Sequence, residues 1–263
     1  MDGKVILVTG SSQGVGLAIA KVLLQKNTRL ILTSRNMQKL TEVKAKLSRL
    51  KNDINVFSCD ATIESEVTNL IQKIEKKFGK IDILINNVGG VKSYGGFFDL
   101  NNNDWIDSFN LNVITTVNFV KHSYKLLLKS KCASIVNIAS ITGIEPGQYN
   151  PHYSITKAAI INLTKHLANL FAKNNIRVNV ICPGIINSES RNNFLNYFSK
   201  KEKIHIDEVT NNANHFDMNN IPLGKLGEGE DVANIVSFLA SEKSSWITGS
   251  CFNIDGGKAK SIF

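Results

Sequence analysis

The sequence lacks the features of membrane, secreted and metal-binding proteins. No apolar run approaches the roughly 20 residues of a transmembrane helix, and residues 1–4 lead directly into a strand-like segment without a signal-peptide pattern. The four cysteines are widely spaced and form no C-x-x-C pair. We therefore predict a cytoplasmic protein without a metal site, in which the cysteines are reduced and structural.

The positive charge is large but is not concentrated in one segment. Lys and Arg number 31 against 22 Asp and Glu, which gives a formal net charge of +9. The basic residues are spread along the expected helices, and neither an aromatic-basic repeat nor a dense basic tail occurs. We predict no nucleic-acid or membrane partner, although the surplus favours an anionic cofactor or substrate.

Short apolar runs alternate with helical patterns along the chain. The runs expected to form strands are residues 5–8, 30–32, 54–57, 81–85, 134–138, 177–181 and 251–254. The expected helices are residues 14–26, 36–51, 63–78, 104–130, 151–173 and 230–240. This alternation predicts an α/β fold with a doubly wound parallel sheet and helices on both faces. No linker divides residues 1–263, so we expect one domain, with a partly helical substrate lid at about 188–220.

A glycine-rich segment from Thr9 to Gly16 follows the first strand and opens the first helix. Glycines allow close approach of a pyrophosphate, and the helix N-terminus offers free N–H groups and a positive dipole end. After the second strand stand Ser34 and Arg35, where a carboxylate would repel a 2′-phosphate. Because Arg can pair with that phosphate, the sequence predicts NADP(H) rather than NAD(H), read by Ser34 and Arg35.

Tyr153 and Lys157 lie four residues apart in the helix expected to begin near Pro151, so their side chains share one face. A nearby cation favours the phenolate and lowers the Tyr pKa toward neutrality, which suits a general acid/base. Such pairs are common on helices, however, and the functional interpretation depends on the other motifs.

Together the motifs resemble those of the short-chain dehydrogenase/reductase superfamily, in its single-domain branch with a Rossmann fold. The resemblance rests on Thr9-Gly10-x-x-x-Gly14-x-Gly16, Asp60, Asn86-Asn87-Val88-Gly89, Asn112, Ser140, Tyr153-x-x-x-Lys157, Arg177-Val178-Asn179, Pro183-Gly184 and Asp255-Gly256-Gly257. The overall pattern is most similar to 3-oxoacyl-carrier-protein reductases.

The resemblance implies a catalytic set of Asn112, Ser140, Tyr153 and Lys157. In this scheme Ser140 binds the substrate carbonyl, Tyr153 transfers the proton, Lys157 binds the nicotinamide ribose and lowers the Tyr pKa, and Asn112 holds a relay water. The expected cofactor contacts are Gly10, Ser12, Gln13, Gly14, Val15, Gly16, Ser34, Arg35, Asp60, Ala61, Asn87, Gly89, Tyr153, Lys157, Pro183, Gly184, Ile186 and Ser188. The expected substrate contacts are Ser140, Ile141, Gln148 and Tyr153, with Glu145 and Tyr149 facing the same cleft.

The function predicted from these residues and the resemblance is NADP(H)-dependent reduction of a carbonyl, or the reverse oxidation. A 3-oxoacyl thioester is one candidate substrate, and a sugar, a steroid or a small ketone is the alternative. A non-catalytic NADP-binding scaffold is the competing class, which the complete catalytic set disfavours. The resemblance also implies a homo-oligomer, either a dimer or a homotetramer.

Overall fold

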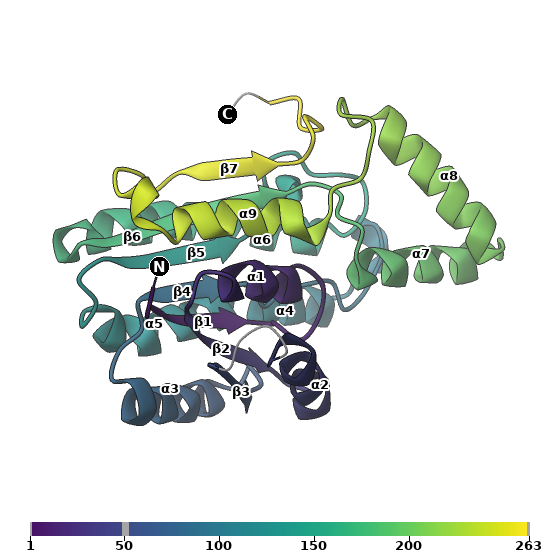
Figure 1. Ribbon diagram of the computed structural model, residues 1–263. Helices are drawn as coiled ribbons and strands as arrows, with labels where there is room; N and C mark the ends of the chain where they lie inside the picture. The colour runs from purple at the N-terminus through teal and green to yellow at the C-terminus, as the bar shows by residue number, and fades with distance from the viewer. Residues whose placement is uncertain (1, 49–52, 262–263) are drawn as a thin grey trace.

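The computed structural model describes residues 2–48 and 53–261, which form a parallel sheet covered by helices on both faces (Figure 1). The strands are β1 (Val5–Thr9), β2 (Arg29–Ser34), β3 (Ile54–Ser58), β4 (Ile83–Asn86), β5 (Ala133–Ile138), β6 (Ile176–Pro183) and β7 (Cys251–Ile254). All neighbouring strands pair in parallel, in the order β3-β2-β1-β4-β5-β6-β7. The predicted α/β fold is therefore confirmed.

Two hydrophobic layers sandwich the sheet. One layer packs α1 (Gly14–Leu24), α2 (Met37–Ser48) and α9 (Gly229–Leu239) on the sheet, and the other packs α3 (Glu64–Phe78), α5 (Thr115–Leu127) and α6 (Pro151–Phe171). Strand β1 contributes to both layers: Ile6 and Val8 belong to the first, and Val5 and Leu7 belong to the second. Successive side chains of a strand point to opposite faces, so a strand that is apolar throughout must be covered on both sides.

The order of the strands places a crevice next to β1. The chain moves outward from β1 to β2 and β3, and then returns across the sheet to β4 on the other side of β1. Connections that leave β1 and β4 in opposite directions separate at the carboxyl ends of these strands. Ligands of doubly wound sheets bind at such a switch point.

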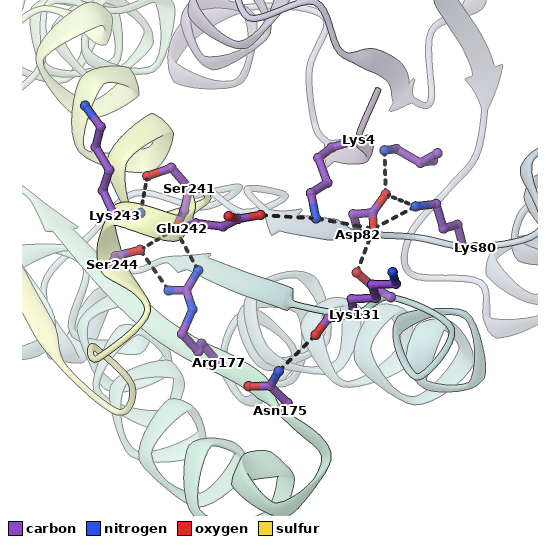
Figure 2. A network of polar contacts seen from close by, with 12 residues as sticks. Lys4, Lys80, Asp82, Lys131, Asn175, Arg177, Ser241, Glu242, Lys243 and Ser244 are labelled. Atoms are coloured by element: carbon purple, nitrogen blue, oxygen red, sulfur yellow. Dashed lines mark hydrogen bonds and ion pairs between the residues drawn. The ribbon is translucent and has the colours of Figure 1, made fainter. Parts of the chain in front are cut away.

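At the amino ends of the strands, opposite the crevice, the sheet is held by a polar network around Asp82, which is buried just before β4 (Figure 2). The Asp82 carboxylate accepts hydrogen bonds from Val5 N at 2.9 Å and Ser130 Oγ at 2.6 Å, and it pairs with Lys80 Nζ at 3.0 Å. Nearby, Arg177 on β6 donates to Ser244 Oγ at 2.9 Å. These contacts join β1, β4 and β6 to the segments at their amino ends, far from the crevice.

The helix expected over residues 104–130 is not one regular helix. It consists of α4 (Asn102–Phe109), a π-helical segment at Asn110–Ile114, and α5. Thr115 N donates to Asn110 O, five residues back, and Thr115 Oγ1 donates to Leu111 O at 2.7 Å. The hydroxyl thus adds a hydrogen bond to a carbonyl within the wider turn.

The segment expected to form a partly helical lid contains two complete helices, α7 (Glu189–Glu202) and α8 (Ile206–Asn219), which project beyond the sheet (Figure 1). The end expected for the second helix, at residues 49–51, lies outside the described residues. The four cysteines are free thiols, but Cys251 is exposed and its Sγ lies 3.3 Å from that of Cys182, so it is not a buried structural residue. Among residues 2–48 and 53–261, no helix is long and apolar enough to cross a membrane.

Candidate active site

A cavity of about 770 Å³ lies at the carboxyl ends of the central strands. Its walls come from the glycine turn after β1, from the ends of β2, β4, β5 and β6, and from the first half of α7. The size falls in the range of ligand pockets, which is about 300–1,000 Å³. One continuous cavity therefore reaches from the Arg35 end of the sheet to Ser140 and Tyr153.

Ser140, Tyr153 and Lys157 converge in this cavity because β5 ends at Ile138, two residues before Ser140, and α6 begins at Pro151. Pro at the first position of α6 suits the fixed backbone of a helix start. The Lys157 ammonium donates to Ile138 O at 3.0 Å and lies 5.4 Å from the centre of the Tyr153 ring. The helical spacing thus places the cation beside the phenol, as expected.

The protonation states of the pair differ from the expectation. Burial raises the pKa of Tyr153 to about 12, and a hydrogen bond with Ser140 opposes this rise. Burial also lowers the pKa of Lys157 to about 8. The expected depression of the Tyr pKa is therefore wrong for the protein alone: the loss of water disfavours both charged forms, and Lys157 donates to a backbone carbonyl. At neutral pH Tyr153 is a phenol that can give a proton.

Asn112 lies in the π-helical segment behind the catalytic residues. Its Oδ1 accepts from Gly90 N at 2.9 Å, and its Nδ2 donates to Gly90 O and Ser108 O, both at 3.0 Å. A Cβ at Gly89 would lie 2.7 Å from Asn112 Oδ1 and 3.0 Å from Lys157 Nζ. The amide of Asn112 therefore fixes the loop after β4, and a Cβ at Gly89 would require the ends of both side chains to shift.

The turn after β1 has the backbone that the glycine pattern predicts. Gly10 and Gly14 adopt φ values of +63° and +54°, in the region that favours glycine, and the space around Gly14 is open. No acidic residue occupies the first turn of α1. Asn87 Nδ2 donates to Gly10 O at 2.9 Å and Asn87 N donates to Thr9 Oγ1 at 3.0 Å, which joins the turn to the end of β4.

Two cations, Arg35 and Lys39, line the cavity at the end of β2 and the start of α2. Lys39 Nζ donates to Gln13 Oε1 at 3.0 Å and pairs with Glu189 Oε1 of α7 at 3.7 Å. Lys39 thus brings a positive charge to Gln13 in the glycine turn.

Most of the predicted site residues line the cavity. Those that do are Gly10, Ser12, Gln13, Gly14, Val15, Ser34, Arg35, Asp60, Ala61, Asn87, Gly89, Ser140, Tyr153, Lys157, Pro183, Gly184, Ile186 and Ser188, together with Tyr149. The structure places Gly16, Asn112, Ile141, Glu145 and Gln148 elsewhere.

Each of these departures has a structural reason. Gly16 is buried where a Cβ would meet Gly10 O at 2.3 Å, so it permits close packing of the turn on α1. Ile141 belongs to a small hydrophobic cluster with Val113 and Ile160. Glu145 Oε2 accepts from Lys260 N at 2.8 Å, and the neighbouring Gln148 is exposed. Ile141 and Gln148 therefore do not line the cavity in this structure.

Several lining residues were not predicted individually, namely Lys39, Thr142, Tyr94, Arg191 and Phe194. A second basic residue shortly after Arg35 was a usable signal for Lys39. Thr142 Oγ1 donates to Ser140 Oγ at 3.1 Å, a contact that depends on the short helical turn after β5. Within the described residues, no cluster of three or more His, Cys, Asp or Glu side chains could hold a metal.

Comparison with known proteins agrees with this geometry. A family model described as "Enoyl-(Acyl carrier protein) reductase" matches residues 10–259. The chain is 30% identical to the 3-oxoacyl-[acyl-carrier-protein] reductase FabG of Thermotoga maritima over 259 residues, 98% of each chain. It is 31% identical over 264 residues to the NADPH-dependent reductase BacG of Bacillus subtilis, covering both chains fully. The structure of L-sorbose reductase from Gluconobacter frateurii, complexed with NADPH and L-sorbose, matches with a TM-score of 0.92 at 28% identity, over 100% of this chain and 98% of that one.

The chain belongs to the short-chain dehydrogenase/reductase superfamily, as the family model and the full-length relatives show. NADPH in the descriptions of BacG and L-sorbose reductase agrees with the cofactor expected from the sequence.

Proposed function

We propose that this protein is an NADP(H)-dependent oxidoreductase that reduces a carbonyl to an alcohol, or catalyses the reverse reaction. The observation that carries the proposal is that Ser140, Tyr153 and Lys157 share one cavity with the glycine turn after β1. A proton donor and a dinucleotide cradle therefore open onto the same space.

The residues of the cavity fit a dinucleotide. Left-handed glycines at positions 10 and 14 and the non-acidic start of α1 suit a pyrophosphate. Arg35 and Lys39 would hold a 2′-phosphate, which an acidic residue at the end of β2 would repel. The names of relatives that use or bind NADPH support the same cofactor.

We propose the following roles for the residues around the reacting carbonyl. When bound, NADPH supplies the hydride that reduces the carbonyl carbon and leaves as NADP⁺. Ser140 Oγ orients the carbonyl oxygen by a hydrogen bond, and Tyr153 gives its phenolic proton to that oxygen, which yields the alcohol. Solvent then restores the proton of Tyr153. Lys157, one of whose N–H groups binds Ile138 O, offers the others to the ribose and stabilises the transient phenolate.

A 3-oxoacyl thioester is one candidate substrate, supported by the FabG relative, and a sugar, a steroid or a small ketone is the alternative. A non-catalytic NADP-binding scaffold would not require a Tyr-Lys pair in the dinucleotide cavity. Consumption of NADPH with a panel of these carbonyls distinguishes the classes, because a scaffold would bind NADPH tightly and consume none.

Tyr153→Phe is the direct test of the mechanism. The variant should bind NADPH with an unchanged Kd, since the ring remains, and should lose nearly all turnover, since the proton donor is gone. General acid catalysis contributes about 10²- to 10⁴-fold, which sets the expected loss. Substantial turnover by this variant would contradict the proposed role.

We also propose a cytoplasmic homo-oligomer, a homotetramer or a dimer. Apolar side chains are exposed on α4 at Ile106 and Phe109 and on α6 at Ile155 and Leu170, two helices that pack side by side. Such faces mark interaction sites. Sedimentation velocity of the wild type and of Phe109→Glu tests the assembly: a monomer in both would contradict it. Cell fractionation tests the compartment.

A further inference from the structure

A cluster of aromatic side chains forms one side of the cavity near the catalytic residues. We define the aromatic wall as Tyr94 from the loop after β4, Tyr149 from the loop before α6, and Phe194, Tyr197 and Phe198 from α7. The ring centroids of Tyr94 and Phe194 lie 5.5 Å apart, those of Tyr94 and Tyr197 5.1 Å, and those of Tyr149 and Phe194 6.2 Å. These separations are typical of interacting aromatic pairs.

The aromatic wall has an inner and an outer part. Tyr94, Tyr149 and Phe194 line the cavity that also contains Ser140 and Tyr153. Tyr197 and Phe198 do not line it and pack behind, with Phe198 at 6.3 Å from Tyr149 and 6.5 Å from Phe194. The outer rings therefore support the inner ones, which contact the same cavity as the catalytic hydroxyls.

Ion pairs hold the wall in place. Arg191 of α7 pairs with Asp217 of α8 at 2.8 Å, and both side chains are largely buried. Lys201, near the end of α7, pairs with Asp99 at 3.5 Å. These contacts position α7 over the cavity, so the wall is built into the fold rather than formed by one mobile side chain.

The cations near the wall already have partners. Besides the Arg191 pair, Lys92 lies 3.5 Å from Asp107. A carboxylate or phosphate on the substrate would have to compete for one of these cations, and for Arg191 this would leave Asp217 buried without its partner. Breaking a buried pair is strongly unfavourable. The substrate end of the cavity therefore suits an uncharged molecule.

We propose that the substrate is a neutral ketone that carries a ring, or the corresponding secondary alcohol. Its ring packs against Tyr94, Tyr149 and Phe194 while its carbonyl lies between Ser140 and Tyr153. This inference rests on the proposed reductase function and narrows it, because a rigid ring packs on aromatic side chains with a smaller loss of conformational entropy than a flexible acyl chain. The reaction consumes one NADPH and one proton for each ketone reduced.

The test compares β-tetralone with methyl octyl ketone, an open-chain ketone with the same number of carbon atoms, and with acetoacetyl-N-acetylcysteamine and L-sorbose. We expect kcat/KM to be highest for β-tetralone. Phe194→Leu should lower kcat/KM for β-tetralone by about 10-fold, as expected for loss of one well-packed aromatic contact, and should lower it by a smaller factor for methyl octyl ketone. Trp246→Leu removes a fully exposed ring outside the wall and is the matched control, with no change expected.

A binding measurement separates the two proposals. Calorimetric titration of β-tetralone into Tyr153→Phe with NADPH bound should show binding without turnover, weakened about 10-fold by a second substitution, Phe194→Leu. Preference for the thioester or the sugar would overturn the ring-ketone inference and leave the reductase function intact. Binding of β-tetralone to this complex with no turnover of any carbonyl by the wild type would overturn the reductase function alone. The absence of both binding and turnover of β-tetralone would overturn the ring-ketone inference.

Discussion

Replacing Lys39 with Met tests how the protein distinguishes NADPH from NADH. The ammonium of Lys39 lies 3.0 Å from Gln13 Oε1 and 3.7 Å from Glu189 Oε1, beside the Arg35 end of the cavity. A 2′-phosphate placed there would carry a charge of about −1.5 to −2 at neutral pH. Lys39→Met keeps the length of the side chain and removes only its charge and donors.

The expected loss of NADPH affinity follows from the separation of the two charges and the solvent exposure of Lys39. Two unit charges about 4 Å apart attract by ~4 kcal/mol at an effective dielectric constant of ~20, and by ~1 kcal/mol in water. Lys39 is about half exposed, with 47% of its side chain accessible, so the lower value applies. A loss of about 1 kcal/mol corresponds to a roughly 5-fold increase in the Kd of NADPH. NADH lacks the phosphate, so its Kd should change less than about 2-fold.

Fluorescence titration of both nucleotides at low and high salt measures these constants. The increase in the Kd of NADPH caused by Lys39→Met should be smaller at 0.5 M salt, because exposed charges are screened. Lys44→Met, on the same helix but away from the cavity, is the matched control and should leave both constants unchanged. Glu189→Gln should lower the Kd of NADPH, since it removes the negative charge that competes with the phosphate for Lys39. Equal weakening of NADPH and NADH by Lys39→Met would refute the reasoning.

Three further predictions concern the catalytic loop, the pH profile and the buried network. Gly89→Ala should lower kcat at least 10-fold, measured by NADPH consumption, because its Cβ would crowd Asn112 and Lys157; wild-type kcat would show that the loop adapts. Alcohol oxidation should accelerate from pH 7 to 10, since it needs the phenolate of Tyr153 and the pKa of this group is raised to about 12; a flat initial-rate profile would argue against this assignment. Asp82→Asn should lower the free energy of unfolding at pH 7 by about 2–4 kcal/mol in urea titrations. Burial opposes ionisation of Asp82, but hydrogen bonds from Ser130 and Val5 and the charge of Lys80 lower its pKa below the ordinary value of about 4. The stability that the Asp82 carboxylate contributes is therefore present above pH 4 and is lost as the pH falls through the folded pKa. An Asp82→Asn variant that stays less stable than the wild type at acid pH would refute this linkage.

Much of the fold could be predicted because its strands are short, apolar and separated by helical patterns. The run Val5 to Val8 is apolar at every position, and a strand of this kind is stable only when helices cover both faces of the sheet. The glycines at positions 10 and 14 likewise indicated a turn that other residues would strain. The π-helical segment around Asn112 could not be predicted, because it depends on a hydroxyl bond from Thr115 and on the contact of Asn112 with Gly90, which is distant in sequence.

The sequence by itself determined the parallel α/β fold, because the alternation of strands and helices depends on local periodicity, and the resemblance of its motifs to a known family supplied the candidate site residues. Tertiary structure alone decided the rest. It placed Ile141 in a hydrophobic cluster instead of the substrate wall, brought Lys39 to Gln13, and raised the pKa of Tyr153 by burial instead of lowering it. It also assembled Tyr94 and Phe194 into one wall. Packing and desolvation depend on residues far apart in the chain, and no local pattern encodes them.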